Sequence, residues 1–278
     1  MAAEADPVQP YTIFARIYDQ VMGSSTFPMI KQGFEEALRR YGINFRSAAD
    51  VGCGTGTFLR YLRTYGVPVI GVDSSAAMLA QAADKNRGIG TVLLRQDMRE
   101  LQLPRRVDLI TCNFDTLNYL LSGPQLARTL QRFQANLTAG GHVIFDILST
   151  PVGPATNHRM VQQIRVPGLS TTWRICWSPH KRWSRVSMLY RFKNAANKPV
   201  SHREEHVQRW YPRSFVNTAL RNAGFRIRGI HDSETSLPAT KDSGWLRYIA
   251  EVMPADYQEV IHGRLPPHGR SFALQGYW

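Results

Sequence analysis

The sequence predicts an α/β fold in which a mostly parallel sheet carries helices on both faces. Three observations indicate this fold. Short apolar runs alternate with longer amphipathic runs between residues 48 and 146, a glycine-rich turn follows the first apolar run, and β-branched and aromatic residues dominate after residue 170. Repeated strand–helix units build parallel sheets, whereas the later segment predicts an inserted antiparallel sheet.

Five strands are expected in the parallel core, at residues 48–51, 67–72, 91–94, 107–111 and 142–146. Helices connect them. The glycine turn opens the first helix, and Ser74 or Ser75 caps the second. Ser122 opens the third, which we expect to close at Gly140 and Gly141.

Segments on both sides of this core complete the predicted fold. Helical periodicity predicts two N-terminal helices, at residues 12–22 and 29–41. About three strands form the inserted sheet, at residues 171–177, 183–193 and 200–211. A helix and two strands end the core, at residues 212–222, 225–231 and 245–252. Five parts follow: an N-terminal helical lid (1–45), a cofactor-binding core (46–150), an inserted β cover (151–211), the end of the core (212–253) and a tail (254–278).

Length and composition are those of a folded protein. The chain has 278 residues, 43% of them hydrophobic, which suffices for a substantial core. No stretch approaches the ~20 apolar residues of a membrane span, and the first residues do not resemble a secretion signal, so we expect a cytoplasmic protein. Three widely spaced cysteines, Cys53, Cys112 and Cys176, predict neither disulfides nor a metal site. Small buried thiols are the simplest interpretation.

Positive charge is concentrated in the second half of the chain. Residues 1–150 hold 15 Lys or Arg and 13 Asp or Glu, whereas residues 151–278 hold 19 and 8. Such a field favours an anionic partner, such as a phosphorylated or carboxylated small molecule, nucleic acid or an acidic protein. A solvated basic surface explains it equally well.

The glycine-rich turn, Gly52-Cys53-Gly54-Thr55-Gly56, carries the main functional signal. A glycine turn between a strand and a helix lets a nucleotide-like ligand approach the backbone at the helix N-terminus. The dinucleotide pattern G-x-G-x-x-G needs its third glycine three positions after the second, but Gly56 follows Gly54 by two. Asp73 ends the second strand, 21 positions after Gly52, where a carboxylate reaches ribose hydroxyls and repels a 2′-phosphate.

The segment Asp50-Val51-Gly52-Cys53-Gly54-Thr55-Gly56 resembles the first motif of class I methyltransferases. The resemblance covers residues 11–146 well and extends more loosely to Val252. It implies a Rossmann-like fold with a seven-stranded sheet, and S-adenosyl-L-methionine as the methyl donor. In this family an acidic residue after the third strand contacts the adenine amino group, and Gln96-Asp97-Met98 stands there. A nicotinamide cofactor or a degenerate fold is the alternative.

The N-terminal segment Ile17-Tyr18-Asp19-Gln20-Val21-Met22 is similar to the Y-D-x-x-M helix of small-molecule methyltransferases, including aminosugar N-methyltransferases and relatives of glycine N-methyltransferase. The resemblance implies that this helix closes over the donor, with Tyr11 and Tyr18 near the reactive methyl group. The alternative is that both tyrosines only pack the helix onto the core. The residues expected to bind the donor are Tyr11, Tyr18, Gly52, Cys53, Gly54, Gly56, Asp73, Ser74, Met78, Asp97, Met98, Asn113 and Phe114.

The segment from Asn113 to Tyr119 follows the fourth strand, where the resemblance places groups that face the substrate. Enzymes that methylate exocyclic amines of nucleic-acid bases usually carry an Asn/Asp-Pro-Pro-aromatic motif there, and this segment has no proline. That difference argues against base methylation. Methylation of RNA at the ribose or at a ring carbon stays compatible with it.

Methyl transfer requires no metal, because the sulfonium donor is already activated and the protein has mainly to align the reactants and exclude water. A base is useful where the acceptor must lose a proton. His206 is the candidate base, since it shares one face of an alternating strand with Glu204, Gln208 and Trp210. A structural histidine is the alternative. We expect Tyr18 and His206 to be catalytic and three residues to bind substrate, namely Asn118, Arg209 and Trp210.

Arginines and tryptophans interleave in the inserted segment, a pattern that suits either a phosphate-bearing or planar substrate or a dimer-forming sheet. The sequence therefore predicts a small-molecule N- or O-methyltransferase whose basic sheet selects the acceptor, which can be anionic. We expect no membrane partner, and a homodimer formed through the inserted sheet. Two alternatives stay open: an RNA methyltransferase, and a catalytically idle module of the same fold that binds nucleic acid or protein.

Overall fold

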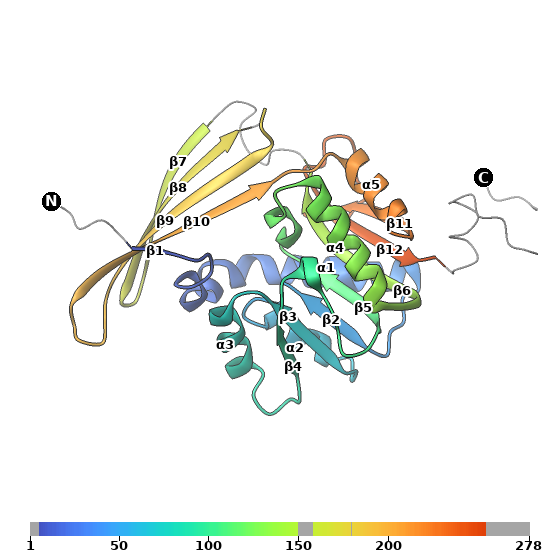
Figure 1. Ribbon diagram of the computed structural model, residues 1–278, viewed down its shortest axis with the longest axis horizontal. Helices are drawn as coiled ribbons and strands as arrows, with labels where there is room; N and C mark the ends of the chain where they lie inside the picture. The colour runs from blue at the N-terminus through green and yellow to red at the C-terminus, as the bar shows by residue number, and fades with distance from the viewer. Residues whose placement is uncertain (1–5, 150–157, 179, 254–278) are drawn as a thin grey trace, which may run out of the picture.

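The computed structural model describes residues 6–149, 158–178 and 180–253. The chain forms two lobes, each built on its own sheet (Figure 1). The larger sheet has seven strands in the order β11-β12-β6-β5-β2-β3-β4, and the smaller has five in the order β1-β10-β9-β8-β7. The predicted seven-stranded α/β sheet with an inserted second sheet is therefore confirmed.

The larger sheet is parallel from β4 to β6, and its last two strands are antiparallel. Its strands are β2 (Ala48–Val51), β3 (Val69–Asp73), β4 (Val92–Arg95), β5 (Val107–Cys112), β6 (Leu137–Leu148), β11 (Phe225–Asp232) and β12 (Trp245–Val252). Successive residues of the central strands face opposite sides of the sheet, so Leu109 and Ile144 join one apolar core and Ile110 and Phe145 join the other.

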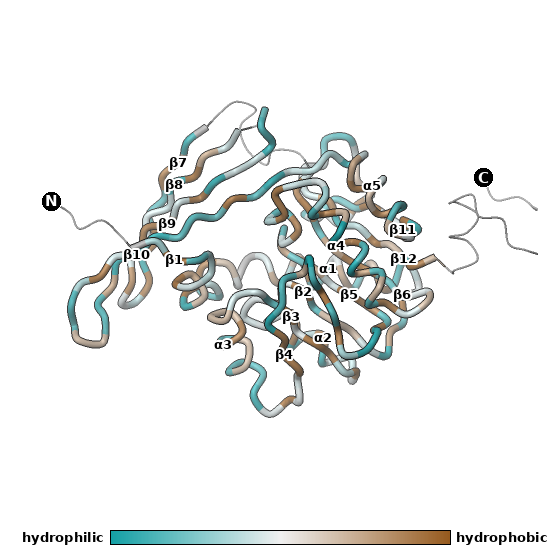
Figure 2. Tube along the Cα trace, in the orientation of Figure 1, coloured by the Kyte–Doolittle hydropathy of each residue, from teal (hydrophilic) through white to brown (hydrophobic). Residues whose placement is uncertain are grey.

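Helices cover both faces of this sheet. The helices are α1 (Ser24–Tyr41), α2 (Thr57–Arg63), α3 (Ala76–Lys85), α4 (Gly123–Asn136) and α5 (Arg213–Asn222). α1 and α2 pack on one face, and α4 and α5 on the other. Hydrophobic residues run along the central strands, and hydrophilic ones occupy many connecting loops (Figure 2). Phe133 of α4 is fully buried, and truncation of such a side chain to alanine costs about 3–5 kcal/mol.

Caps explain where two of these helices begin. The Ser75 side chain accepts the backbone N–H of Met78 and caps α3. Ser122 forms a capping box with Gln125 at the start of α4, as its position in the sequence predicts. The expected end of α4 at Gly140 and Gly141 is wrong, because α4 ends at Asn136 and these glycines lie within β6. The β5–β6 register shifts at this point, so the glycines serve a strand irregularity.

The N-terminal segment differs from the two predicted helices. It contains a 3₁₀ turn at Phe14–Arg16 and a π-helix at Asp19–Gly23 that runs directly into α1. Tyr11 has a left-handed backbone with φ of 62°. The N–H groups of Tyr11, Ile13 and Phe14 donate to the carboxylate of Glu204, so this stretch is held by a side chain of the second sheet.

The inserted sheet has more strands than predicted. Its antiparallel strands are β7 (His158–Val166), β8 (Leu169–Ser178), β9 (Trp183–Lys193) and β10 (Pro199–Arg209), and β1 (Asp6–Val8) pairs parallel to β10. Strand β7 is not predicted because its residues are largely polar, and β10 ends two residues before its predicted end. One face of this sheet packs against the N-terminal segment through Ile13, Phe14, Trp173 and Tyr190.

Two other expectations concern the ends of the chain and the membrane. The tail predicted from residue 254 lies outside the described residues. Within the described part of the chain, no helix is long and apolar enough to cross a membrane.

Candidate active site

The carboxyl ends of the parallel strands meet at one edge of the larger sheet. In α/β sheets of this kind, ligands bind outside that edge. Three of the predicted site residues end or follow strands there: Asp73 ends β3, Asp97 follows β4 and Asn113 follows β5. The glycine turn follows β2 at the same edge. The structure thus brings Asp73, Asp97, Asn113 and the glycine turn, all expected at the donor site, to one edge of the sheet.

The three glycines of the turn all have left-handed backbones, with φ of 73° at Gly52, 53° at Gly54 and 78° at Gly56. Their surroundings differ. A Cβ at Gly52 would lie 2.5 Å from Thr116, and one at Gly56 would lie 2.6 Å from Asn86. A Cβ at Gly54 would meet nothing within 4 Å. Gly52 and Gly56 therefore serve packing, whereas Gly54 leaves its backbone open to a ligand.

Asp73 is tied to the glycine turn. Its carboxylate accepts the backbone N–H of Gly54 at 2.9 Å and that of Ser75 at 2.8 Å. Burial raises the pKa of Asp73, while these backbone donors oppose the shift. A carboxylate with two of its lone pairs held in place is oriented in advance for ligand hydroxyls.

A second group of polar residues lies where β5 and β6 end. Phe114 and Asp115 have left-handed backbones, with φ of 65° and 45°, and both N–H groups donate to the buried carboxylate of Asp146. Burial and the nearby charge of Asp146 raise the pKa of Asp115 to about 7. The Asn113 side-chain amide nitrogen is buried and has no hydrogen-bond partner among the described residues. Strained backbone and an unsatisfied donor together are typical of a ligand site.

A chain of four side chains joins this edge to the inserted sheet. The Tyr11 hydroxyl lies 2.7 Å from that of Tyr119, which lies 2.9 Å from Nδ1 of His206. Nε2 of His206 lies 3.1 Å from the carboxylate of Glu204. Glu204 and His206 are both buried, and burial raises the pKa of both tyrosines. We call these residues the Tyr–His–Glu chain.

Tyr18 lies beside this chain. Its ring contacts those of Tyr11, Phe14 and Phe114, and its hydroxyl has no hydrogen bond to any residue that the structure describes. Burial raises the pKa of Tyr18, and the carboxylate of Asp115 adds to that shift. Tyr11 and Tyr18 are therefore close to each other and to the polar group at the end of β5.

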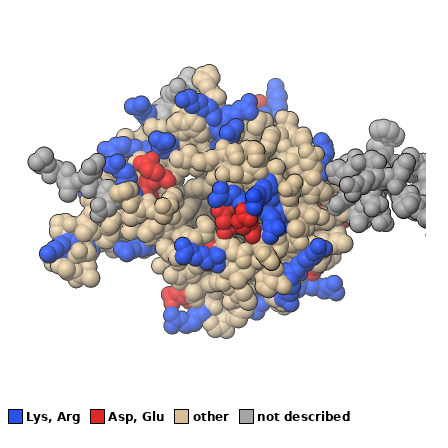
Figure 3. Space-filling view, in the orientation of Figure 1, with Lys and Arg blue, Asp and Glu red and all other residues tan. Residues whose placement is uncertain are grey.

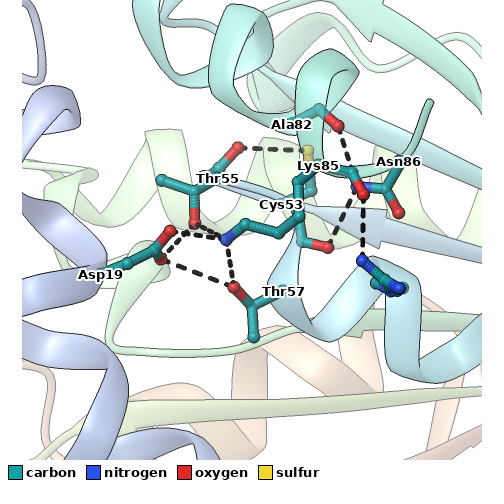
Figure 4. Close-up of polar contacts among 10 residues, drawn as sticks. Asp19, Cys53, Thr55, Thr57, Ala82, Lys85 and Asn86 are labelled. Atoms are coloured by element: carbon teal, nitrogen blue, oxygen red, sulfur yellow. Dashed lines mark hydrogen bonds and ion pairs between the residues drawn. The ribbon is translucent and has the colours of Figure 1, made fainter.

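A polar cluster holds the N-terminal segment against the glycine turn (Figure 4). Lys85 Nζ lies 2.6 Å from the carboxylate of Asp19, 3.0 Å from Thr55 Oγ1 and 2.5 Å from Thr57 Oγ1. The Thr55 hydroxyl also donates to Asp19, at 2.6 Å. We call these four residues the lid latch. No sequence pattern predicts it, because its members come from separate elements.

The other residues expected at the donor site lie in different environments. Cys53 is buried, and burial raises the pKa of its thiol. Ser74 is exposed, and its carbonyl accepts the Arg95 guanidinium. Met78 is a buried residue of α3, and the partly buried Met98 packs against the core.

Asp97 is held by a neighbouring cation. The guanidinium of Arg99 donates to both of its carboxylate oxygens, through Nε at 2.9 and 3.0 Å and through Nη2 at 2.5 Å. This pair lowers the pKa of Asp97. A ligand amino group would have to share this carboxylate with Arg99.

The three residues expected to bind substrate have separate surroundings. The amide of the fully buried Asn118 donates to the carbonyls of Leu148 and Arg209 and accepts the N–H of Leu148. Asn118 therefore joins β6 to β10, and its amide nitrogen has no donor left for a ligand. The Arg209 guanidinium donates to the Leu121 carbonyl, and buried Trp210 lines a different cavity.

Two residues of the Tyr–His–Glu chain were not expected to act in the site, namely Tyr119 and Glu204. Glu204 gives a weak signal in the sequence, because it alternates with His206 on one strand face. Tyr119 gives none beyond its place after β5, since only the tertiary structure brings it to His206.

Comparison with known proteins identifies a domain in the larger lobe. Residues 48–141 match the methyltransferase domain family. This chain carries a methyltransferase domain. The matched residues run from β2 to the start of β6, so they contain the glycine turn, Asp73, Asp97 and Asn113. The predicted resemblance to methyltransferases is thereby confirmed for this part of the chain.

Relatives extend the similarity beyond the domain. A Geobacillus sp. (strain WCH70) protein named "Putative methyltransferase" is 34% identical over 143 residues, 50% of this chain and 58% of that protein. The dTDP-3-amino-3,6-dideoxy-alpha-D-glucopyranose N,N-dimethyltransferase of Streptomyces fradiae is 27% identical over 229 residues, 81% of this chain and 89% of that protein. The match to the first relative thus spans under two thirds of its length.

A solved structure shares the fold over most of the chain. The S-adenosylmethionine-dependent methyltransferase of Clostridium acetobutylicum ATCC 824 superposes with a TM-score of 0.74 at 23% identity, covering 88% of this chain and 99% of that one. The superposed part of the chain is longer than the segments that form the larger sheet and its helices. The shared fold therefore includes the inserted sheet.

Proposed function

We propose that this protein is an S-adenosylmethionine-dependent N-methyltransferase that acts on the amino group of a sugar-like small molecule. The observation that carries the proposal is the Tyr–His–Glu chain, which ends in a tyrosine hydroxyl beside the donor-site edge of the sheet. An amino sugar is largely protonated at neutral pH, so it must lose a proton before its nitrogen can accept a methyl group. The long match to a relative named as an aminosugar N,N-dimethyltransferase supports this acceptor.

The residues at the sheet edge fit the donor. The open backbone at Gly54 accommodates the close approach of a nucleoside, and the oriented carboxylate of Asp73 suits the ribose hydroxyls. Asp97 would take the adenine amino group, and the unsatisfied amide of Asn113 offers a donor to the same ligand. When bound, S-adenosylmethionine supplies an electrophilic methyl group carried on a sulfonium.

The hydrogen bonds of the Tyr–His–Glu chain fix the direction in which a proton moves. If the His206 Nε2–H donates to the Glu204 carboxylate, Nδ1 accepts from Tyr119, and the Tyr119 oxygen accepts from Tyr11. The Tyr11 oxygen then has a free lone pair for the proton of the acceptor ammonium. As that proton arrives, the Tyr11 proton moves to Tyr119 and the Tyr119 proton moves to His206. Neither tyrosine has to become a phenolate.

Glu204 stabilises the imidazolium that results. Its carboxylate is fully buried and also accepts three backbone N–H groups of the N-terminal segment, two of them at 3.0 and 3.1 Å. The same carboxylate therefore orients His206 and holds the segment that carries Tyr11 and Tyr18. The aromatic rings of Tyr11, Phe14, Tyr18 and Phe114 then exclude water from the acceptor nitrogen.

Some expectations stay predictions beside this proposal. Arg209 and Trp210 as substrate-binding residues, a homodimer through the inserted sheet and an RNA acceptor belong to this group. Sizing of the protein in solution tests the dimer, and an acceptor screen that includes a short RNA tests the last.

The test combines donor binding with acceptor choice. Calorimetric titration should show that S-adenosylmethionine and S-adenosylhomocysteine bind the protein, that Asp73→Asn weakens both, and that Asp84→Asn does not. Asp84 is a matched control because it is an aspartate of α3, the helix that follows Asp73, and its carboxylate is exposed. A labelled donor should then methylate a nucleotide-linked 3-amino sugar, but not its 3-hydroxy counterpart or a short RNA. Absence of donor binding, or preferred methylation of the hydroxyl sugar or RNA, would refute the proposal.

A further inference from the structure

Two carboxylates, those of Asp115 and Asp146, lie close together where β5 and β6 end. Asp146 is buried and Asp115 is partly buried. Neither forms an ion pair with a residue that the structure describes. Like charges in a site that excludes water destabilise each other unless an opposite charge joins them. The pair is therefore short of positive charge.

The two carboxylates differ in how many hydrogen bonds they accept. Asp146 accepts two backbone N–H groups and, at 3.0 Å, Nε1 of Trp245. Arg247, its partner on β12, offsets part of its charge from a distance. Asp115 accepts a single hydrogen bond, from the side-chain amide of Gln208 to Oδ2. Its Oδ1 accepts none from any residue in the described part of the chain, so this oxygen stays available to a ligand.

Asp115 lies next to the Tyr–His–Glu chain. It comes four positions before Tyr119, which contacts His206. Asp115 itself contacts Gln208, two positions after His206 on the same face of β10. Its carboxylate also acts electrostatically on both tyrosines of the chain and on Tyr18, raising the pKa of each. The free oxygen of Asp115 therefore lies near the hydroxyl that takes the acceptor proton.

The rest of the protein does not attract cations. The chain has a formal net charge of +13. Lysine and arginine side chains are spread over the face shown in Figure 3, whereas acidic side chains form a few small groups there. A field of this sign disfavours the approach of an ammonium group. Recognition of a cationic nitrogen therefore needs a local anion.

We propose that Oδ1 of Asp115 binds the ammonium group of the acceptor and so selects a nitrogen acceptor over a hydroxyl. The inference rests on the proposed function for the class of acceptor. Gln208 is the positioning residue, because its amide holds the other oxygen of the carboxylate. The bound ammonium supplies the positive charge that Asp115 and Asp146 lack.

The same carboxylate serves the transfer step. Tyr11 takes one proton from the ammonium, and the nitrogen lone pair then forms the bond to the methyl carbon while the carbon–sulfur electron pair goes to sulfur. Positive charge thus leaves sulfur and develops again on nitrogen, beside Asp115. An anion fixed at that place stabilises the transition state as well as the bound acceptor.

The test is calorimetric titration of the protein loaded with S-adenosylhomocysteine, at pH 7, using a nucleotide-linked 3-amino sugar and its 3-hydroxy counterpart. The unmodified protein should bind the amino sugar about tenfold or more tightly, as expected for a hydrogen bond between charged groups. Asp115→Asn should remove most of this preference and leave the affinity for the hydroxy sugar unchanged. Asparagine tolerates the left-handed backbone of this position, where φ is 45°.

Asp84→Asn is the matched control, because it makes the same change at an exposed carboxylate and should keep the preference. Unchanged affinity for S-adenosylhomocysteine shows that both variants are folded. With labelled donor, Asp115→Asn should raise KM for the amino sugar and also lower kcat, since the carboxylate acts on the bound acceptor and on the transition state. Gln208→Ala should shift both in the same direction by less.

Several results would overturn the inference. One is a preference that survives in Asp115→Asn, and another is an equal loss of affinity for both sugars. If Asp115→Asn weakens binding of S-adenosylmethionine but not of S-adenosylhomocysteine, the carboxylate faces the sulfonium instead and the inference fails. If the unmodified protein methylates the amino sugar but binds both sugars equally, the inference alone fails. If neither sugar binds, the proposed function fails and the inference falls with it.

Discussion

Nδ1 of His206 lies 2.9 Å from the hydroxyl oxygen of Tyr119, although 87 positions separate the two residues in the sequence. Tyr119 belongs to the segment after β5, and His206 to β10 of the inserted sheet. The contact therefore exists only because β10 returns to the edge of the larger sheet. A histidine so placed, with a carboxylate behind it, is equipped to receive a proton.

Loss of His206 should slow methyl transfer most at low pH. For His206→Gln, we expect kcat to fall about 10²–10⁴-fold near neutral pH, the usual contribution of a general base. Part of the loss should return at high pH, where more of the acceptor amine is already deprotonated. A pH–rate profile measures this. His202→Gln, on the same strand, is the control, and a uniform loss at every pH would contradict the role of His206 as a base.

Replacement of Gly54 by alanine should abolish donor binding, whereas its effect on the stability of the fold should be smaller. Gly54 and Gly66 both have positive φ, of 53° and 73°, and a Cβ at either position would meet nothing within 4 Å. The backbone strain of an alanine is thus similar at both, about 1–2 kcal/mol. Of these two glycines, only Gly54 lies in the glycine turn. Calorimetry should therefore show lost donor affinity for Gly54→Ala and not for Gly66→Ala. Equal effects would remove the argument for close approach at Gly54.

Much of the fold could be predicted because its signals are local. Strand β12 has the predicted bounds, and Ser122 caps α4 as expected, since apolar runs and capping residues act within a few positions. Residues 12–22 do not form the single predicted helix: they contain a 3₁₀ turn and most of a π-helix, and the N–H groups of Tyr11, Ile13 and Phe14 are anchored on the buried carboxylate of Glu204. No local pattern reports a partner about 190 residues away.

The site shows the same division. The glycine turn and Asp73 have a spacing that the sequence displays directly, whereas Tyr119 joins the site only through a tertiary contact with His206. Asn118 shows the opposite error. Its position after β5 suggested substrate binding, but its amide is used by the backbone of β6 and β10. Sequence position alone cannot distinguish a polar side chain that faces a ligand from one that faces backbone.

Gly33 should be intolerant of any side chain. A Cβ at this position in α1 would lie 1.6 Å from Nη1 of Arg247, whose side chain is buried and whose guanidinium reaches Ser233 and Ser236. We expect Gly33→Ala to lower the free energy of unfolding by about 3 kcal/mol, through overpacking and displaced hydrogen bonds. Denaturant unfolding measures it. Arg247→Met in the same chain should recover part of the loss, and strict additivity of the two changes would argue against this contact.

Asp50 should make the folded state less stable as pH rises. Burial raises its pKa to about 7, despite the hydrogen bond from Thr111, whereas in the unfolded chain it titrates near its usual value of about 3.9. Between these values the folded state holds the extra proton, so stability decreases as pH rises through this window. Asp50→Asn mimics the protonated form and should be more stable relative to the unmodified protein at pH 8 than at pH 5, on the order of 2 kcal/mol. The difference between the two unfolding curves isolates this group, and a constant difference would show that Asp50 is ionised throughout.

The lid latch should control how long the donor stays bound. Lys85 joins Asp19 of the π-helix to Thr55 and Thr57 at the glycine turn, so its loss frees the segment that carries Tyr11 and Tyr18. The ion pair is partly exposed, with side-chain exposures of 24% and 44%, and its removal should lower stability by only about 1 kcal/mol.

Lys85→Met should nevertheless speed donor dissociation several-fold, because an open lid no longer covers the bound ligand. High salt should reproduce part of that change in the unmodified protein by screening the ion pair. Arg87→Met is the matched control, since Arg87 lies just beyond α3 and its ion pair with Asp84 is largely exposed to solvent. Stopped-flow measurement of donor release distinguishes the cases. Equal release rates for the Lys85 and Arg87 variants would mean that the latch stabilises the fold without gating the site.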